Sequence, residues 1–298
     1  HLIRQEDLAR TLERLGKEGS AGFYAGRFAD LLATTVRAAG GIWTADDLAS
    51  YRVVERDPVV ADYPWARIVS AAPPSSGGVA LVTMLNILGG VGPVGDDRAL
   101  RAHYIVEAMR RAYHDRAAHL GDPDFWPVPV DALLAPSHAD ALRDTIDPEA
   151  ATPSRMLDGL SAPGPGGEDT SHFSIFDRQG NRVAATLSIN YPFGSGFVAP
   201  GTGVLLNDEM DDFSARPGSP NAYGLVGGEA NAIAPGKRPL SSMTPTFVET
   251  DDRVAVLGTP GGSRIITMVL LATLEFLEGG DARAMVGLPR FHHQYLPD

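Results

Sequence analysis

Apolar residues recur at helical spacing through most of the first half of the chain. Leu8, Leu12 and Leu15 are three or four residues apart, which is typical of one face of an amphipathic helix. A second helix is predicted over 25–39, where two consecutive glycines end it, and helical spacing resumes over 98–120. The first half of the chain is therefore predicted to be mainly helical.

Two segments between these helices carry more local signals. In "TADDLASY", 44–51, Thr44 precedes a helix and Asp47 stands three residues later, which is the arrangement of a capping box. Residues 63–88 pass from a short strand through "PPSSGG" into an apolar helix. We therefore expect a strand, a tight turn and a buried helix to follow one another there.

Beyond residue 170 the apolar spacing changes to that of β-strands. "SHFSIFD" and "NRVAATLSIN" flank "RQG", and "SMTPTFVE" and "RVAVLGTP" flank a second polar turn, so two antiparallel pairs are predicted. The apolar run 265–277 is too short to cross a bilayer and is predicted to be a core helix. Helices, then strands, then a helix predict an α+β fold in which helices cover a mostly antiparallel sheet.

The segment 151–169 lies at the boundary between the two patterns. It is rich in Pro, Gly, Ser and Asp without periodicity, which is typical of a mobile surface linker, and it ends at Asp169. Thr170 follows and directly precedes the first predicted strand. A threonine hydroxyl is a poor nucleophile unless a base removes its proton, and its own α-amine, with a pKa of about 7.7–8, can be that base. This chemistry requires a chain break immediately before Thr170.

Composition and charge narrow the choice of partners. The chain has 298 residues, of which 44% are hydrophobic, so it can fill the core of one large domain or of two smaller ones. Its formal net charge is -12 and no block of Lys and Arg interrupts that acidity, which argues against nucleic acid as a partner. Because there is no Cys, a thiolate nucleophile, a disulfide and a Cys-bound zinc are excluded.

Histidine, serine and glycine motifs give weaker candidates. His114 and His119 are five residues apart, the wrong spacing for one helix face, and the adjacent pair at 292–293 would diverge in a strand, so no metal site and no cofactor are predicted. Ser75 and Ser76 could act as nucleophiles, but a turn with a helix N-cap is favoured there. HExxH and GxSxG motifs are absent, and "FGSGF" and "GLVGG" lack a Walker lysine, so zinc-protease, α/β-hydrolase and nucleotide-binding interpretations are weak.

Three polar segments in the last third of the chain are candidates for binding. "LLNDEMDDF", 205–213, is either a solvated acidic loop or a cluster of carboxylates that binds an ammonium group. "KRPLSSMTP", 237–245, offers paired hydroxyls. "GTPGGSR", 258–264, is either a plain strand-to-helix turn or a source of backbone N–H donors for an oxyanion.

Five blocks, taken in order, carry a family resemblance. "DTSHFSIFDRQGN", "SINYPFGSGF", "GVLLNDEMDDFSARPGSPNAYGLVGG", "NAIAPGKRPLSSMTPT" and "GTPGGSRIIT" resemble the γ-glutamyltransferase family, the glutathione hydrolases of the N-terminal-nucleophile hydrolase superfamily. "GGIWTADDLASYRVVERDPV", "APPSSGG" and "HLGDPDFWPVPV" resemble the large-subunit region of the same family. The resemblance covers nearly the whole chain. It implies a four-layer αββα sandwich, made as one precursor that cleaves itself between Asp169 and Thr170.

This cleavage would divide a single domain into two subunits. Residues 1–169 would be the C-terminal part of the large subunit, helical and ending in a flexible linker, and 170–298 would be the β-rich, catalytic portion of the small subunit. The family also has an N-terminal region, with an arginine that pairs with the donor's carboxylate, and a C-terminal tail. Both are expected to be absent from these residues.

The resemblance also implies roles for individual residues. Thr170 would attack the γ-glutamyl amide of glutathione or a related donor and pass the γ-glutamyl group to water or to an amino acid or peptide acceptor. Ser188 would orient or activate Thr170, and the N–H groups of Gly261 and Gly262 would form the oxyanion hole. The other implied contacts are Asn190, Glu209 and Asp212 to the donor's α-ammonium, Ser241 and Ser242 to its α-carboxylate, and Tyr223 on a lid over the site.

The sequence also gives an expected cellular location and two alternative functions. The resemblance implies a periplasmic or secreted protein. One alternative is a cephalosporin (glutaryl) acylase on the same scaffold, and the other is an unprocessed, inactive homologue that binds γ-glutamyl compounds. The acidic cluster and Tyr223 favour γ-glutamyl donors over the acylase, because a glutaryl group has no ammonium to bind.

Overall fold

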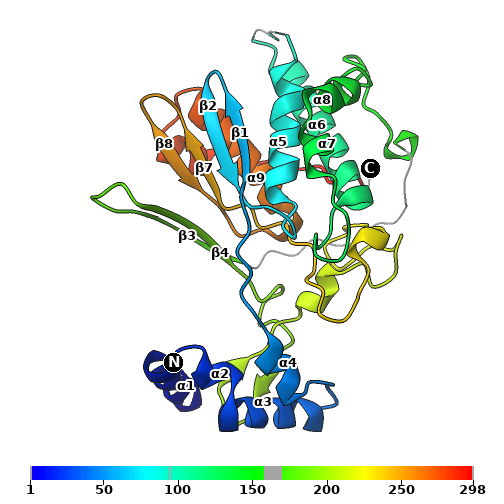
Figure 1. Cartoon of the computed structure of the whole chain (residues 1–298). Coiled ribbons are helices and arrows are strands. Elements are labelled where there is room, and N and C mark those ends of the chain that lie inside the picture. Colours follow the sequence, from blue (N-terminus) through cyan, green and yellow to red (C-terminus); the bar gives the residue numbers. More distant parts are fainter. Residues whose placement is uncertain (1, 93, 95, 158–169, 297–298) are drawn as a thin grey trace. The chain divides into compact units, whose positions relative to one another are not determined.

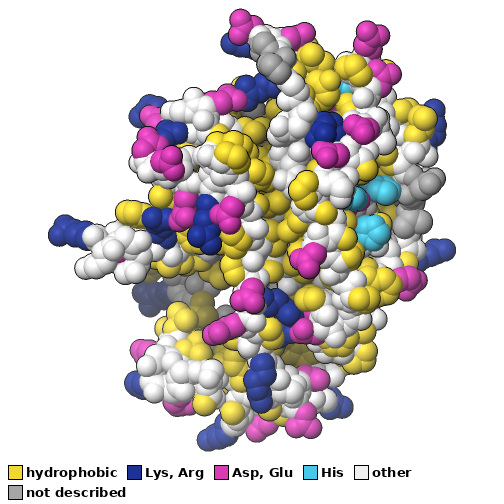
Figure 2. All heavy atoms as spheres, turned by 45° about the horizontal axis from the view of Figure 1, so that its top comes forward, with side chains coloured by type: hydrophobic (Ala, Val, Ile, Leu, Met, Phe, Trp, Pro, Cys, Tyr) yellow, Lys and Arg dark blue, Asp and Glu magenta, His cyan; other side chains and the backbone are white. Residues whose placement is uncertain are grey.

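The computed structural model describes residues 2–92, 94, 96–157 and 170–296, and they divide into two compact units. The smaller unit combines 1–56 with 191–208, and the larger combines 57–190 with 209–298. Within the described residues, no helix combines the length and the apolar character that a membrane crossing needs. On the face drawn in Figure 2, basic side chains are interspersed with acidic ones, so no basic patch forms there.

The smaller unit is a helical cluster with one short strand pair. Its core is the apolar face of the third helix, where Phe28, Leu32 and Val36 pack with Leu48 and Ala199. The predicted helices at 25–39 and after Thr44 are confirmed, the latter with the capping box that the sequence predicts. The elements are α1 (Glu6–Glu18), α2 (Ala21–Tyr24), α3 (Gly26–Ala38), α4 (Ala45–Ser50), β5 (Val198–Ala199) and β6 (Val204–Leu205).

The larger unit contains the remaining helices and strands. Its strands are β1 (Val59–Tyr63), β2 (Ala66–Ser70), β3 (Ser171–Phe176), β4 (Arg182–Leu187), β7 (Thr246–Glu249) and β8 (Val254–Leu257). Its helices are α5 (Gly77–Gly89), α6 (Arg98–His119), α7 (Val130–Leu134), α8 (Pro136–Arg143), α9 (Ile265–Leu277) and α10 (Ala282–Gly287). Four single-turn 3₁₀ helices join them: η1 (Ser154–Met156), η2 (Glu209–Asp212), η3 (Glu229–Asn231) and η4 (Gly262–Arg264).

A four-stranded antiparallel sheet, in the order β1-β2-β7-β8, is the base of the larger unit. Ile68, Val248 and Ala255 lie opposite one another in the register of β2, β7 and β8, and all three are buried. Helix α5 packs against β1 and β2, and α9 packs against β8 and α5 (Figure 1). The predicted α+β class, with helices over an antiparallel sheet, is confirmed.

The two helices next to the sheet are apolar on nearly every side. Every residue of α5 from Gly77 to Leu85 is buried, and in α9 most residues between Ile265 and Phe276 are buried. A helix that is hydrophobic all round must be enclosed by other elements, and α6 provides that cover for α5. The run 265–277 is therefore a core helix, as predicted from its length.

Helix α6 is unusual because it buries charged side chains. Glu107 and Arg111 form an ion pair in which neither side chain is exposed, and Arg116 is also buried one turn further on. Arg111 makes further hydrogen bonds to the carbonyl oxygens of Leu142 and Thr145. Burial of a charge requires such partners, so the polar contacts of α6 fix the helix in one position.

The predicted hairpin after residue 170 is confirmed as β3 and β4, paired from Ser171 opposite Leu187. The hairpin contacts β8, where the Ser174 hydroxyl donates to the Val256 carbonyl oxygen at 3.0 Å. One face of the hairpin carries exposed apolar side chains, namely Phe173, Ile175, Val183 and Leu187. Within the described part of the chain this face has no cover.

The turn between β2 and α5 is pinned to a distant segment. Ser76 N–H and the Ser76 hydroxyl both donate to the Ser241 carbonyl oxygen, at 2.8 and 2.7 Å, and Ser241 N–H donates to the Pro74 carbonyl oxygen at 2.8 Å. The predicted turn is confirmed. The helix N-cap is confirmed as well: Ser76 is the N-cap residue of α5, and Ser75 Oγ accepts the N–H of Gly77 at 3.2 Å, while the Ser76 hydroxyl donates to Ser241.

Gly77→Ala tests how closely α5 approaches the segment after Ser241. A Cβ at Gly77 would lie 2.6 Å from the Met243 carbonyl oxygen and 2.4 Å from Thr244 Oγ1, so either the helix or the segment must shift. We expect a loss of about 1–3 kcal/mol in the free energy of unfolding, measured by urea denaturation of the complete natural protein.

Gly89→Ala is the matched control for this substitution. Gly89 is in the same helix and has no atom within 4 Å of a built Cβ. We expect its free energy of unfolding to stay within about 0.5 kcal/mol of the wild type. Equal destabilisation by both substitutions would contradict the close approach.

Candidate functional site

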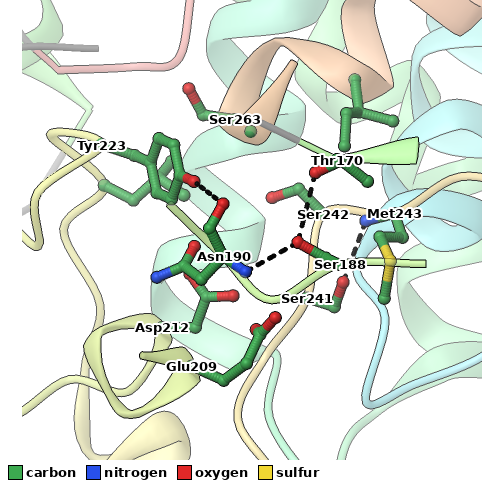
Figure 3. A pocket seen from close by; sticks show the side chains of 13 residues that line it. Thr170, Ser188, Asn190, Glu209, Asp212, Tyr223, Ser241, Ser242, Met243 and Ser263 are labelled. Atoms are coloured by element: carbon green, nitrogen blue, oxygen red, sulfur yellow. Dashed lines mark hydrogen bonds between the residues drawn. The ribbon is translucent and has the colours of Figure 1, made fainter. Parts of the chain in front are cut away.

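One cleft of the larger unit collects most of the residues that the sequence singles out (Figure 3). They come from six separate stretches of the chain, so only folding brings them together. The lining residues are Thr170, Ser188, Asn190, Glu209, Asp212, Tyr223, Leu225, Ser241, Ser242, Met243, Gly262, Ser263 and Ile265.

Two hydroxyl groups meet at the open end of the β3–β4 hairpin. Thr170 immediately precedes β3 and Ser188 immediately follows β4, so the strand register makes them neighbours. Their oxygens, Thr170 Oγ1 and Ser188 Oγ, are 3.3 Å apart. Ser188 Oγ also accepts the N–H of Asn190 at 2.9 Å. The hairpin therefore holds a threonine hydroxyl in the cleft with a second hydroxyl beside it.

Asn190 and Tyr223 form one wall of the cleft. Asn190 has a φ of 73°, a left-handed backbone conformation that Asn tolerates better than most residues. The Tyr223 hydroxyl donates to the Asn190 carbonyl oxygen at 3.0 Å, and Tyr223 is buried. Asn221 Oδ1 accepts the N–H groups of Tyr223 and Leu225, each at 3.0 Å, which fixes the loop that carries the tyrosine.

The acidic segment forms a 3₁₀ turn, η2, that points two carboxylates into the cleft. Burial raises the pKa of Asp212 to about 8, and the nearby negative charge of Glu209 is the second cause of this rise. The positive charge of Arg116 opposes it. Asp212 is therefore not part of a fully solvated loop, the simpler of the two interpretations of "LLNDEMDDF". A cationic ligand would lower the pKa of Asp212 again, because a nearby positive charge favours the ionised carboxylate.

Ser241 and Ser242 present hydroxyl groups that each already accept one hydrogen bond. Ser241 Oγ accepts the N–H of Met243 at 3.0 Å, and Ser242 Oγ accepts a guanidinium N–H of Arg116 at 3.2 Å. Across the described ranges, neither hydroxyl has a protein acceptor for its own proton. Both protons are thus available for donation, which suits an anionic group such as a carboxylate.

The two glycines at the start of η4 adopt conformations that a side chain would obstruct. Gly261 has a φ of 143° and Gly262 a φ of 53°, and a Cβ on Gly261 would lie 2.2 Å from Cε of Met268. Gly262 lines the cleft, whereas Gly261 is buried beside it. Neither N–H donates a backbone hydrogen bond to any described residue. The strand-to-helix turn is present, and the role of these N–H groups as oxyanion donors stays a prediction.

The other candidates from the sequence lie elsewhere or cannot be placed. Asp169 is outside the described residues, so the predicted scissile bond has only its Thr170 side in the structure. The described histidines do not line the cleft, and His292 instead contacts Thr267. Of the described residues, no group of His, Asp and Glu is arranged to hold a metal ion.

Four lining residues were missed by the sequence reasoning: Leu225, Met243, Ser263 and Ile265. Leu225, Met243 and Ile265 are apolar and carry no chemical signal that distinguishes them from core residues. Each is, however, within three residues of a predicted site residue, and so is Ser263. Arg116, behind Ser242, was also missed, because one arginine in a helix rich in arginine does not stand out in the sequence.

The fold belongs to the class of N-terminal-nucleophile hydrolases. The structure matches the crystal structure of cephalosporin acylase from Bacillus halodurans with a TM-score of 0.76 and 26% sequence identity, over 96% of this chain and 50% of that chain. The chain belongs to the gamma-glutamyltranspeptidase family, whose model matches residues 1–298.

Two relatives show how close the family relationship is. The chain is 48% identical to the glutathione hydrolase proenzyme of Pseudomonas sp. (strain A14), over 99% of this chain and 52% of that protein. It is 46% identical to the glutathione hydrolase proenzyme of Escherichia coli (strain K12), over 99% of this chain and 51% of that protein. The chain thus spans about half the length of the curated relatives it matches.

The raised pKa of Asp212 predicts a specific dependence of stability on pH. Between the ordinary aspartate pKa of 3.8, which applies to the unfolded chain, and the folded pKa of about 8, the folded state keeps a proton that the unfolded state has lost. The stabilisation from this proton is complete below about pH 4 and is lost as the pH rises through 8. The free energy of unfolding of the wild type minus that of Asp212→Asn should therefore fall by roughly 2–4 kcal/mol over this window.

Urea denaturation of both proteins at several pH values measures this difference. The asparagine has nearly the same shape but no titratable proton, so other groups cancel in the subtraction. A difference that stays constant or grows with pH would show that Asp212 is solvated.

Proposed function

We propose that this chain is the catalytic portion of an autoprocessing γ-glutamyltransferase, which cleaves the γ-glutamyl amide of glutathione and related donors. The observation that carries the proposal is the meeting in one cleft of three kinds of group: the Thr170 hydroxyl, the acids of η2, and the paired serine donors. A nucleophile beside an ammonium site and a carboxylate site fits an acyl group that ends in an α-amino acid.

Donor recognition follows from the charges around the cleft. Asp212 and Glu209, with the Asn190 side chain, bind the α-ammonium, because two partly desolvated carboxylates favour a cation. Ser241 and Ser242 donate their hydroxyl protons to the α-carboxylate. The ammonium and the carboxylate are on one carbon, so the two subsites together orient the γ-carbonyl toward Thr170.

Processing is the first chemical step of the proposal. The Thr170 hydroxyl attacks the carbonyl carbon of Asp169, and the peptide C–N bond breaks as the ester bond forms. The hydroxyl proton passes to the nitrogen of Thr170, which becomes the new α-amine. Water then hydrolyses the ester. The products are a chain that ends at Asp169 and a chain that begins with Thr170, whose α-amine, with a pKa of about 7.7–8, is a base near neutral pH.

Transfer of the γ-glutamyl group uses the same hydroxyl. The α-amine of Thr170 takes the hydroxyl proton as Oγ1 attacks the donor amide, and the proton passes to the leaving amine when the C–N bond breaks. The N–H groups of Gly261 and Gly262 stabilise the oxyanion, and Ser188, 3.3 Å from Thr170 Oγ1, orients the nucleophile. Water, or the amine of an amino acid or peptide, then attacks the ester and restores the hydroxyl.

The proposal extends to the complete scaffold. We propose that 1–169 and 170–298 belong to a large and a small subunit that remain together as a four-layer αββα sandwich. The uncovered apolar face of β3 and β4 supports this, because exposed Phe173, Ile175 and Leu187 suit the interior of a second layer. From the family resemblance, we also propose that the protein acts in the periplasm or outside the cell.

Thr170→Ala tests processing most directly. The complete natural protein should yield a fragment whose first residue is Thr170, detected by a denaturing gel and by mass spectrometry. Thr170→Ala removes the hydroxyl and should leave the chain intact, whereas Thr170→Ser keeps it and should still be cleaved. An intact wild-type chain would favour the inactive binding homologue over the enzyme.

A pair of donors tests recognition. A γ-glutamyl anilide and a glutaryl anilide differ only in the ammonium, so the wild type should prefer the former. Asp212→Asn should lower kcat/KM for the γ-glutamyl anilide by about 10²-fold, since a hydrogen bond to a charged group contributes about 1.5–3 kcal/mol, and should change that for the glutaryl anilide little. Preference of the wild type for the glutaryl compound would indicate an acylase instead.

A further inference from the structure

Arg116 lies behind the cleft without lining it. Only 4% of its surface is exposed, and its guanidinium donates from Nε to Ser76 Oγ at 2.9 Å and from Nη2 to Ser242 Oγ at 3.2 Å. These two serines are 166 residues apart in the chain, so the guanidinium joins the turn before α5 to the segment before β7. The contacts point to a role in the site, because Ser242 is part of the cleft and Ser76 holds Ser241.

The chemistry of the guanidinium determines which way the Ser242 hydroxyl points. A guanidinium has only N–H donors, so Ser242 Oγ must accept from it and cannot donate to it. Ser76 Oγ accepts in the same way and donates its own proton to the Ser241 carbonyl oxygen at 2.7 Å. Arg116 therefore commits Ser242 to be a donor into the cleft and, through Ser76, fixes the neighbouring serine.

The charge of Arg116 acts on both ends of the proposed donor. Its attraction to Asp212 opposes the rise of the Asp212 pKa, so it keeps more of that carboxyl in the ionised form that binds an ammonium. Burial lowers the pKa of Arg116, while Asp212 and Tyr113 raise it, and an arginine stays protonated in proteins. A buried positive charge behind Ser242 also attracts an incoming carboxylate, with little screening by solvent.

We propose that Arg116 is a positioning residue that makes the enzyme select donors bearing an α-carboxylate, by holding Ser242 as a hydrogen-bond donor and by placing a positive charge behind it. This inference rests on the proposed function. Arg116 does not contact the reacting atoms, so its effect falls on donor binding and on the choice between donors.

The test compares two donors and a matched pair of variants in the complete natural protein. The donors are γ-glutamyl p-nitroanilide and 4-aminobutanoyl p-nitroanilide, which has the same chain and ammonium but no α-carboxylate. Arg116→Lys keeps the positive charge but removes the planar guanidinium, whose N–H groups bond both serines. Arg111→Lys is the control, because Arg111 is buried in the same helix, forms an ion pair with Glu107 and touches no residue of the cleft.

Arg116→Lys should lower kcat/KM for the γ-glutamyl donor about 10-fold to 100-fold, chiefly by raising KM. It should lower kcat/KM for the 4-aminobutanoyl donor less than about threefold. Arg111→Lys should change kcat/KM for both donors by the same factor. If Arg116→Lys leaves kcat/KM unchanged, or lowers kcat/KM for both donors by the same factor, the inference is wrong and Arg116 is only structural.

Ser242→Ala supplies the second readout. Arg116→Lys keeps the positive charge, so most of its effect should come from the lost contact with the Ser242 hydroxyl. The double variant Arg116→Lys/Ser242→Ala should be within about twofold of Ser242→Ala alone for the γ-glutamyl donor, whereas multiplied losses would contradict the inference. If Arg116→Lys fails to fold or to be processed, Ser76→Ala, which removes one tether, should show a smaller loss confined to the same donor. A wild type that cleaves neither donor would overturn the proposed function, and this inference with it.

Discussion

The attachment of the turn at 74–76 to Ser241 is the constraint on which the rest of the site depends. Three hydrogen bonds join the turn to Ser241 itself, and the Ser75 hydroxyl donates to the Met243 carbonyl oxygen. Gly77 allows α5 to approach that carbonyl oxygen more closely than any side chain would permit. The turn leads into α5 and Ser241 leads into β7, so the helical layer and the sheet are fixed at this point. The paired serines of the cleft are therefore held by the core of the fold.

Buried charge is the second organising feature of the larger unit. Arg116 bonds two serines and opposes the raised pKa of Asp212, so one cation serves two parts of the cleft. A buried charge with few partners destabilises a fold, and here the partners are groups that a substrate would also contact. The proposed recognition of a zwitterionic donor uses this arrangement, because an ammonium matches the acids of η2 and a carboxylate matches the paired serine donors.

The hairpin of β3 and β4 links the fold to the proposed chemistry. Its register places Thr170 beside Ser188, and its contact with β8 brings that end to the glycine turn of η4. Apolar side chains on its outer face are exposed, so the described residues do not cover this face of the hairpin. That observation agrees with a chain that spans about half the length of its relatives.

The sequence by itself determined the local elements and the chemical types of the site residues. Helical and strand spacing, the Thr44 capping box and the turn before α5 depend on residues close in sequence, and the structure confirms them. The tertiary structure alone decided which groups meet. The Arg116 contact with Ser242 does not follow from spacing, and neither does the hydrogen bond from the Ser76 hydroxyl to the Ser241 carbonyl oxygen. Pairing across more than a hundred residues depends on strand register and helix packing, which no local pattern contains.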